Sequence, residues 1–276
     1  MTAPVPIALA ALTVYPVKSL RGFALKTSEV GSEGLAEDRR WMLVDANDRF
    51  VSQRELPELA TLPLRFAPGQ LDFDHPTQGP LSVRLPTRDA PVRRVRVWGD
   101  TLVAQDAGDA IAAWLEGVFA RPLRLVAFTE HSARLADSTY AAATPIRFSD
   151  GFPLLLINQA SLNAVNAATG FSLGAERFRA NLVLTGLGAF AEDQLERVVL
   201  GDIELRLVKP CTRCAIVGID PQTGQRSMDP LPWLKQQRFD TSLRGATFGW
   251  NAIVTRGIGS VLSLQQTGLA YPRVGA

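Results

Sequence analysis

The stretch KPCTRCAIVGIDPQTG, residues 209–224, contains the only two cysteines of the 276-residue chain, Cys211 and Cys214. The strand-like run IELRLVK leads into it, and the pair is followed by AIVGID, which ends at an Asp-Pro turn. Apolar and β-branched residues on both sides are typical of two strands joined at the cysteines, with no helix beginning at Cys211. The stretch therefore predicts a β-rich fold that holds a C-x-x-C pair between two strands.

The cysteine spacing alone allows several kinds of site. A redox dithiol is expected at a helix N-terminus, where the helix dipole lowers the thiol pKa, and the strand pattern argues against it. Structural zinc needs four ligands, but the two histidines, His75 and His131, stand far apart in the sequence. Free cysteines are most often small buried apolar residues. Lys209 and Arg213 would instead place cations beside the thiols and favour a thiolate that binds a soft metal, so structural and functional roles remain about equally supported.

Short β-like runs separated by turn residues extend from about residue 7 to residue 103, which is typical of a barrel or sandwich. They are ALTVYPV, WMLVDANDRFVSQ, LPLRF, LSVRL and VRRVRVWGDTLVAQ. The next segment, DAGDAIAAWLEGVFA, has apolar residues at helical spacing and predicts an amphipathic helix packed on the barrel, with Asp106 or Asp109 as N-cap. The apolar positions are Ile111, Trp114, Leu115, Val118 and Phe119.

The second half of the chain is also predicted to be mostly β. Residues 132–151 have little apolar periodicity and predict a long loop or crossover. Beyond it, QASLNAVNAATG predicts a helix ending at Gly170, and LPWLKQQR a short helix with Pro232 in its first turn. Strands are predicted at PLLLIN, RFRANLVLTG, ERVVLGDIELRLV, CAIVGID and GWNAIVTRG. The expected fold class is mainly β with a few helices (α+β), with a β-barrel-like domain at residues 1–148 and a second domain at 149–276.

Composition narrows the classes of protein. With 46% hydrophobic and 20% charged residues the chain is expected to be a soluble globular protein, and a net charge of +2 gives no reason to expect a nucleic-acid partner. The N-terminus has no basic segment before its short apolar run, and no run approaches the roughly 20 apolar residues that span a bilayer. Two neighbouring cysteines cannot form a disulfide framework. We therefore expect a cytoplasmic protein without membrane attachment.

Four stretches, taken together and in order, are similar to one family. YPVKSLRG (15–22), GLAEDRRWMLVD (34–45), ERFRANLVLTG (176–186) and KPCTRCAIVGIDPQTG (209–224) resemble the MOSC-domain proteins that carry an N-terminal MOSC β-barrel. The mitochondrial amidoxime-reducing component and bacterial hydroxylaminopurine-reducing proteins are members. The resemblance implies that residues 149–276 form a MOSC β-barrel domain, with a cofactor cleft between the two domains.

The resemblance also implies the cofactor and the residues that bind it. The family binds molybdenum cofactor (molybdopterin with its molybdenum), and the second cysteine of the motif is the protein ligand of the metal. Cys214 is therefore the expected molybdenum ligand and catalytic residue, and Cys211 a packing neighbour. Ammonium and guanidinium groups suit the phosphate and pterin oxygens of such an anion. The expected cofactor contacts are Lys18, Ser19, Arg39, Asp150, Gly151, Arg179, Asn181, Thr212, Arg213, Cys214 and Asn251.

The activity implied by the resemblance is reduction of N-hydroxylated compounds, from N–OH to N–H with release of water, a detoxification reaction. Some relatives hold a 2Fe-2S cluster in an additional domain, and the mitochondrial members have a membrane anchor. Neither is expected here: two cysteines cannot supply the four thiolates of a cluster, and no apolar run is long enough to span a bilayer. Electrons are then expected from a separate donor protein, such as a ferredoxin, a flavin reductase or a cytochrome b5-like protein, acting on a monomer. The alternatives are a non-catalytic carrier of molybdenum cofactor and a sulfur carrier that uses a Cys214 persulfide.

Overall fold

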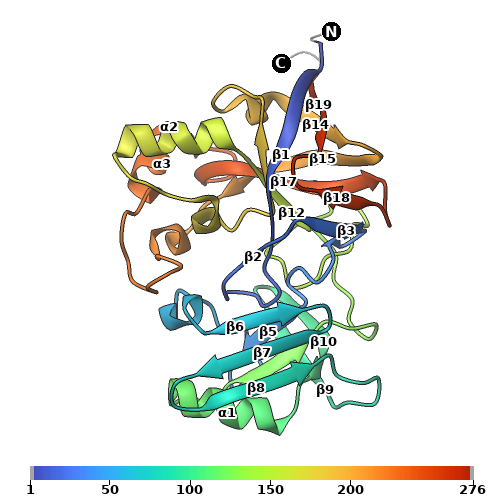
Figure 1. The fold of residues 1–276 in the computed structure, drawn as a ribbon, viewed down its shortest axis with the longest axis vertical. Helices are drawn as coiled ribbons and strands as arrows, with labels where there is room; N and C mark the ends of the chain where they lie inside the picture. Colours follow the sequence, from blue (N-terminus) through green and yellow to red (C-terminus); the bar gives the residue numbers. More distant parts are fainter. Residues whose placement is uncertain (1–2, 274–276) are drawn as a thin grey trace.

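The protein consists of two β-rich halves that lie one above the other along the long axis of the molecule (Figure 1). The computed structural model describes residues 3–273. Strands dominate these residues, and three α-helices lie against the sheets. The predicted class, mainly β with a few helices, is confirmed.

The upper half is a closed barrel. Seven strands form the ring, and it closes because β12 pairs in parallel with β13 and antiparallel with β17. Around the ring the strands are β12 (Leu154–Asn158), β13 (Leu182–Thr185), β1 (Val5–Val14), β19 (Thr267–Pro272), β14 (Leu195–Leu200), β15 (Ile203–Thr212) and β17 (Gly245–Arg256). Leucines from several of these strands, among them Leu9, Leu156 and Leu205, are buried in one apolar core.

The first strand of the chain belongs to this barrel. β1 runs antiparallel between β13 and β19, with Leu12 opposite Leu182 and Ile7 opposite Gly268. Both ends of the described chain consequently lie at the top of the barrel (Figure 1). The predicted division into residues 1–148 and 149–276 does not take into account that β1, from the first of these segments, is a strand of the barrel formed by the second. The boundary itself stays a prediction.

Short strands extend the barrel toward the lower half. β2 (Phe23–Ala24) pairs with β1, β16 (Phe239–Asp240) pairs with β17, and a small separate sheet contains β3 (Thr27–Gly31), β4 (Gly34–Leu35) and β18 (Val261–Ser263). From β4 the chain enters the lower half.

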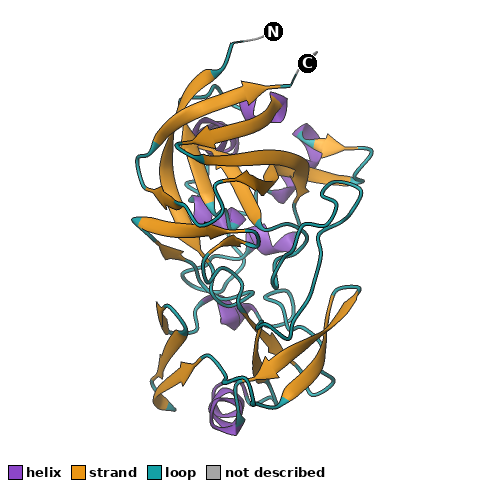
Figure 2. Cartoon of the chain, turned by 90° about the vertical axis from the view of Figure 1, so that its right-hand side faces the viewer, coloured by secondary structure: helices purple, strands orange, loops and turns teal. Residues whose placement is uncertain are grey.

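The lower half is a half-barrel made of two open sheets (Figures 1 and 2). One contains β5 (Trp41–Val44), β11 (Arg124–Ala127), β10 (Asp100–Asp106) and β9 (Val92–Val97); the other contains β6 (Leu64–Ala67), β7 (Gln70–His75) and β8 (Gly79–Arg84). Between them lies an apolar core that includes Leu43, Phe73 and Leu125. Helix α1 (Asp109–Phe119) packs Ile111, Trp114 and Leu115 into the same core, as its spacing predicts.

The predicted N-cap of α1 is wrong. Gly108 occupies that position, with no side-chain cap. The Asp106 carboxylate instead accepts hydrogen bonds from the Arg124 guanidinium at 2.6 and 3.0 Å and from the Gly108 N–H at 2.8 Å. The Asp106 carboxylate is therefore paired with Arg124 of the neighbouring strand β11 and does not cap the helix.

The other helices and the long connection match their predictions. α2 (Gln159–Thr169) ends at Gly170, whose positive φ of 72° suits glycine at a helix C-cap. α3 (Leu231–Gln237) has Pro232 in its first turn. Residues 128–153 contain neither helix nor strand and carry the chain from the lower half back to the barrel.

Of the predicted strands, one is wrong and another is wrong in part. CAIVGID does not form a strand: after β15 the chain makes a 3₁₀ turn at Ala215–Gly218, in which the Val217 N–H donates to the Cys214 carbonyl. The beginning of RFRANLVLTG likewise lies in a 3₁₀ turn at Ala175–Phe178, and only Leu182–Thr185 is a strand. Val217 and Phe178 are buried in one apolar core, so the two turns pack their apolar side chains inward where a strand would alternate them.

Candidate active-site cleft

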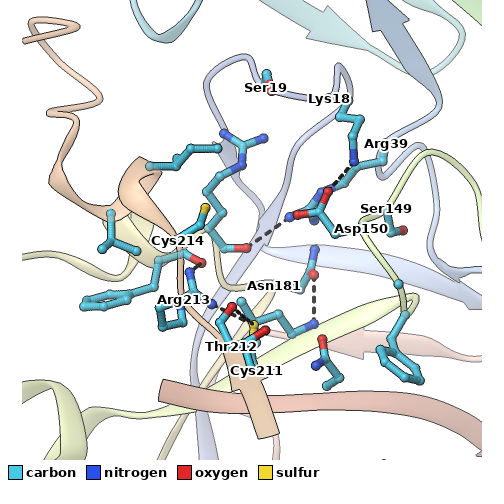
Figure 3. Close-up of a pocket in the computed structure, with 18 of the residues that line it drawn as sticks. Lys18, Ser19, Arg39, Ser149, Asp150, Asn181, Cys211, Thr212, Arg213 and Cys214 are labelled. Carbon is cyan, nitrogen blue, oxygen red and sulfur yellow. Dashed lines mark hydrogen bonds and ion pairs between the residues drawn. The ribbon is translucent and has the colours of Figure 1, made fainter. Parts of the chain in front are cut away.

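An open cleft lies between the barrel and the lower half, with about 860 Å³ of empty space including the part open to solvent. All the residues that the sequence predicts as cofactor contacts line this cleft, together with Cys211. They come from several distant segments: the loop after β1, the turn before β5, the end of the 128–153 connection, the turn before β13, the end of β15, and β17 (Figure 3). The structure thus brings the predicted set together at one place.

Lys18 lies at the wall nearest the lower half. Its Nζ donates to the Asp150 Oδ1 at 2.5 Å and to the Phe148 carbonyl at 2.7 Å, and it stands 4.8 Å from the centroid of the Phe50 ring. Burial lowers the Lys18 pKa to about 8, although the Asp150 charge opposes the shift. Enclosure by the cleft would raise the Asp150 pKa, but Lys18 and the Trp98 indole N–H outweigh it and hold the pKa below its usual value.

Arg39 and Arg179 form a second cationic group. Their guanidinium carbons each lie 4.3 Å from the centroid of the buried Tyr15 ring. Arg39 donates to both carboxylate oxygens of Asp38, at 2.8 and 2.6 Å, and to the Arg179 carbonyl at 3.1 Å. Arg179 donates to the Leu20 carbonyl at 2.7 Å. Burial, followed by the nearby charge of Arg39, lowers the Arg179 pKa to about 10.

The backbone is strained at several of these positions. Ser19, Arg39 and Arg179 have φ values of 68°, 47° and 57°, in the left-handed region that non-glycine residues seldom occupy. Such conformations cost on the order of 1–3 kcal/mol each and concentrate at functional sites. The strained backbone at these three residues is therefore of the kind found at functional sites.

The cysteines differ in their surroundings. Cys214 is exposed, at the start of the turn after β15. Cys211 is half-buried, and Arg213 donates to its Sγ at 2.9 Å. Burial raises the Cys211 pKa, while the charge and the hydrogen bond of Arg213 act in the opposite direction and favour the thiolate, as expected, without outweighing burial. Lys209 contributes nothing here, because its Nζ lies 3.9 Å from Asp137 and 4.3 Å from the Tyr140 ring centroid.

Arg213 anchors the cysteine turn. Its Nη2 donates to the Phe178 carbonyl at 2.6 Å, while its Nε is buried and has no hydrogen-bond partner within the described chain. A buried N–H of a charged group without a partner is costly. The Arg213 side chain thus leaves one buried donor unsatisfied beside the cleft.

The remaining predicted contacts are partly used by the fold. Asn181 accepts from the Leu155 N–H and donates to the Thr13 carbonyl, both at 3.1 Å, so its amide joins β1 to β12. The Asn251 amide donates to the Lys209 carbonyl at 3.2 Å. Gly151 has open space where a side chain would begin, which permits close approach of a ligand to its backbone. Thr212 is exposed beside Cys211.

Sequence reasoning missed several residues of the cleft. Phe50, Arg54 and Trp98 line it from the lower half, and they fall in no motif of the family resemblance. The available signal was a tryptophan at the turn of VWGD, a position where a large apolar side chain is unusual. Within residues 3–273 no cluster of three or more His, Cys, Asp and Glu side chains could hold a metal ion, so a metal would need a ligand set completed by another group.

The charge balance of the cleft predicts a pH-dependent anion site. Because the Lys18 ammonium attracts an anion and its pKa is about 8, sulfate affinity of the cofactor-free protein should fall as the pH rises through that value. Sulfate keeps its charge over this range, so the rise in melting temperature that it produces, measured on either side of that pH, reports on the protein. Lys18→Met should remove the pH dependence and the exposed Lys26→Met should keep it. Equal sulfate effects at both pH values in the wild type would contradict the assignment.

The same pKa shift has the opposite effect on the free protein. The folded state loses the Lys18 proton at about 8 and the unfolded chain at about 10.5. Between these values the unfolded state binds more protons, so this contribution to the free energy of unfolding rises with pH.

Among residues 3–273 no helix has the length and apolar character to cross a membrane.

Residues 7–122 match the family model of the MOSC N-terminal beta barrel domain, and residues 143–264 match that of the MOSC domain. Human "Mitochondrial amidoxime-reducing component 1" is 32% identical over 243 residues, which cover 83% of this chain and 72% of that protein.

Two further relatives extend the comparison. The mouse protein of the same name is 30% identical over 252 residues, covering 87% of this chain and 74% of that protein. Human "Molybdenum cofactor sulfurase" is 28% identical over 256 residues, which cover 82% of this chain and 28% of that much longer protein. With both domain models matched and these identities over most of its length, the chain belongs to the family of MOSC proteins that carry an N-terminal MOSC β-barrel domain.

Proposed function

We propose that the chain is a molybdenum-cofactor-dependent reductase that converts N–OH groups to N–H with release of water. The observation that carries the proposal is an exposed thiol, Cys214, in a cleft whose charged lining residues are all cations except Asp150. The names of the amidoxime-reducing relatives support the reaction.

The residues fit such a cofactor by their chemistry. Five cations line the cleft, against the single carboxylate of Asp150, and Arg39 is paired with Asp38 just outside it; the five are Lys18, Arg39, Arg54, Arg179 and Arg213. The lowered pKa values of Lys18 and Arg179 reflect burial of positive charge, which an entering anion would compensate. A thiolate is a soft ligand suited to a molybdenum centre.

Each residue then has a definable task. Cys214 would ligate the metal, and the guanidinium groups of Arg39, Arg179 and Arg213 would hold phosphate and pterin oxygens. Lys18, fixed by Asp150 and the Phe148 carbonyl, would supply a further positive charge. When bound, the cofactor supplies the two-electron reduction of the N–OH group.

The electron donor, the location and the oligomeric state belong to this proposal. We expect electrons from a separate protein, such as a ferredoxin, a flavin reductase or a cytochrome b5-like protein. We further propose a cytoplasmic monomer that removes N-hydroxylated compounds as a detoxification step.

A second candidate is favoured by the similarity to the cofactor sulfurases. In this function Cys214 would carry a persulfide for delivery to another protein, and the exposed thiol would suit transfer. A non-catalytic carrier of molybdenum cofactor would use the same cleft but reduce no substrate.

Turnover by the cofactor-loaded protein separates these functions. With reduced viologen as electron donor, we expect reduction of benzamidoxime or hydroxylaminopurine at roughly 1 s⁻¹ or faster, in the range of ordinary enzymes. Protein purified from a host that cannot make the cofactor is the control and should be inactive. Retention of cofactor without turnover would overturn the reductase in favour of a carrier, and mass spectrometry showing a persulfide on Cys214 without turnover would favour sulfur transfer.

A further inference from the structure

Trp98 occupies an unusual place at the cleft. It forms the turn between β9 and β10, and 45% of it is exposed although it lines the cleft. Its φ of 53° lies in the left-handed region, where a bulky residue is a genuine outlier. Strain of this kind persists only where the surroundings over-determine the conformation, and it is found at ligand-binding positions.

The indole of Trp98 has four neighbours, and one of them is Lys18, whose Nζ lies 5.7 Å from a ring centroid. The indole Nε1 donates to Asp150 Oδ1 at 3.0 Å, a bond from the lower half to the connection that leads into the barrel. The Phe50 ring meets it edge-on, with centroids 5.3 Å apart and planes at 79°. The Arg54 guanidinium carbon lies 4.6 Å from a ring centroid, and within the described residues Arg54 forms no ion pair.

These contacts hold an exposed aromatic surface in a set orientation in the same cleft as Cys214. Asp150 accepts hydrogen bonds from both the Trp98 indole and the Lys18 ammonium, so it links the indole to a charged residue of the cleft. Trp98 comes from the lower half and Cys214 from the barrel, so a substrate in the cleft would lie between the two halves of the protein.

We propose that Trp98 is the stacking surface for a planar aromatic substrate and makes the enzyme prefer aromatic N-hydroxylated compounds to aliphatic ones. The reaction named here rests on the proposed reductase function, whereas the choice of Trp98 rests on its position and contacts in the cleft. An amidoxime conjugated to an aromatic ring is flat, and its polar group withdraws electrons, which favours offset stacking on the electron-rich indole. A short aliphatic amidoxime has the same reacting group and no ring to stack.

Kinetics with a matched pair of substrates test the preference. We expect wild-type enzyme to show a KM for benzamidoxime about tenfold below that for acetamidoxime, the scale of aromatic stacking measured by alanine substitution. Trp98→Ala should raise only the benzamidoxime KM, to the acetamidoxime value. Trp98→Phe retains a ring and loses the indole N–H, so it should restore most of the preference. Phe239→Ala removes an exposed aromatic residue outside the cleft and should change neither KM.

Binding without turnover keeps this test separate from the proposed function. With no electron donor present, benzamidoxime should quench tryptophan fluorescence of the wild type and bind about tenfold more weakly to Trp98→Ala. This holds even if the protein reduces no N-hydroxylated compound. Equal effects of Trp98→Ala on both substrates, or a loss of bound molybdenum and pterin in that variant, would overturn the proposal, since Trp98 would then support the fold or the cofactor.

Discussion

Replacing Cys214 with Ala should lower reduction of benzamidoxime by at least about a hundredfold, because changes beside a metal ligand already cost 10–100-fold and this change removes the proposed ligand itself. The side chain is exposed, so we expect the free energy of unfolding to change by less than about 0.5 kcal/mol. The assay with reduced viologen measures activity, and a thermal melt confirms folding.

The matched control is Cys211→Ala, three residues earlier, near the end of β15. Its Sγ accepts from Arg213 at 2.9 Å and packs against the core beside the barrel. We expect activity within about tenfold of wild type and a stability cost of about 1 kcal/mol. An active, molybdenum-loaded Cys214→Ala protein would contradict the ligand assignment, and equal inactivation by both substitutions would indicate a dithiol.

Arg39→Ala should destabilise the fold and weaken cofactor binding together. The Arg39 side chain is 12% exposed and the Asp38 side chain 1% exposed, and Asp38 also accepts from the Tyr15 N–H at 2.8 Å. Removing one partner of a buried pair costs about 3–5 kcal/mol, which corresponds to a fall in melting temperature of roughly 10 °C for a chain of this size. Thermal unfolding of the cofactor-free protein measures this cost.

Arg179→Ala is the comparison variant. Arg179 touches the same Tyr15 ring and has a similar left-handed backbone, but no carboxylate is paired with it among the described residues. Its loss should therefore reduce retained molybdenum while lowering the melting temperature less than Arg39→Ala does. An Arg39→Ala melting temperature equal to that of the wild type would contradict the buried-pair argument.

The strands and helices could be predicted where local pattern and tertiary packing agree. Ile111, Trp114 and Leu115 define α1, and Gly170 ends α2, because spacing and φ are local properties. The position of β1 could not be predicted in this way: its partners Leu182 and Gly268 lie more than 150 residues away, and pairing over such separations leaves no local signal. The AIVG segment looked like a strand, but burial of Val217 beside Phe178 selected a turn.

The residues of the cleft could be predicted only together, as a set of family motifs. Lys18, Arg39 and Arg179 separately resemble ordinary surface charges, and only the family motifs connect them. The left-handed backbones of Arg39 and Arg179 and the hydrogen bond that joins Trp98 to Asp150 are recorded in no short motif. The raised Cys211 pKa could not be predicted either, because it depends on burial by distant residues.

The central claim, that Cys214 binds molybdenum in this cleft, is tested most directly by molybdenum X-ray absorption of the loaded protein and of Cys214→Ser. We predict a sulfur ligand that is present in the wild type, lost from the Cys214→Ser spectrum and retained in Cys211→Ala. Identical sulfur coordination in the wild type and Cys214→Ser would contradict the account.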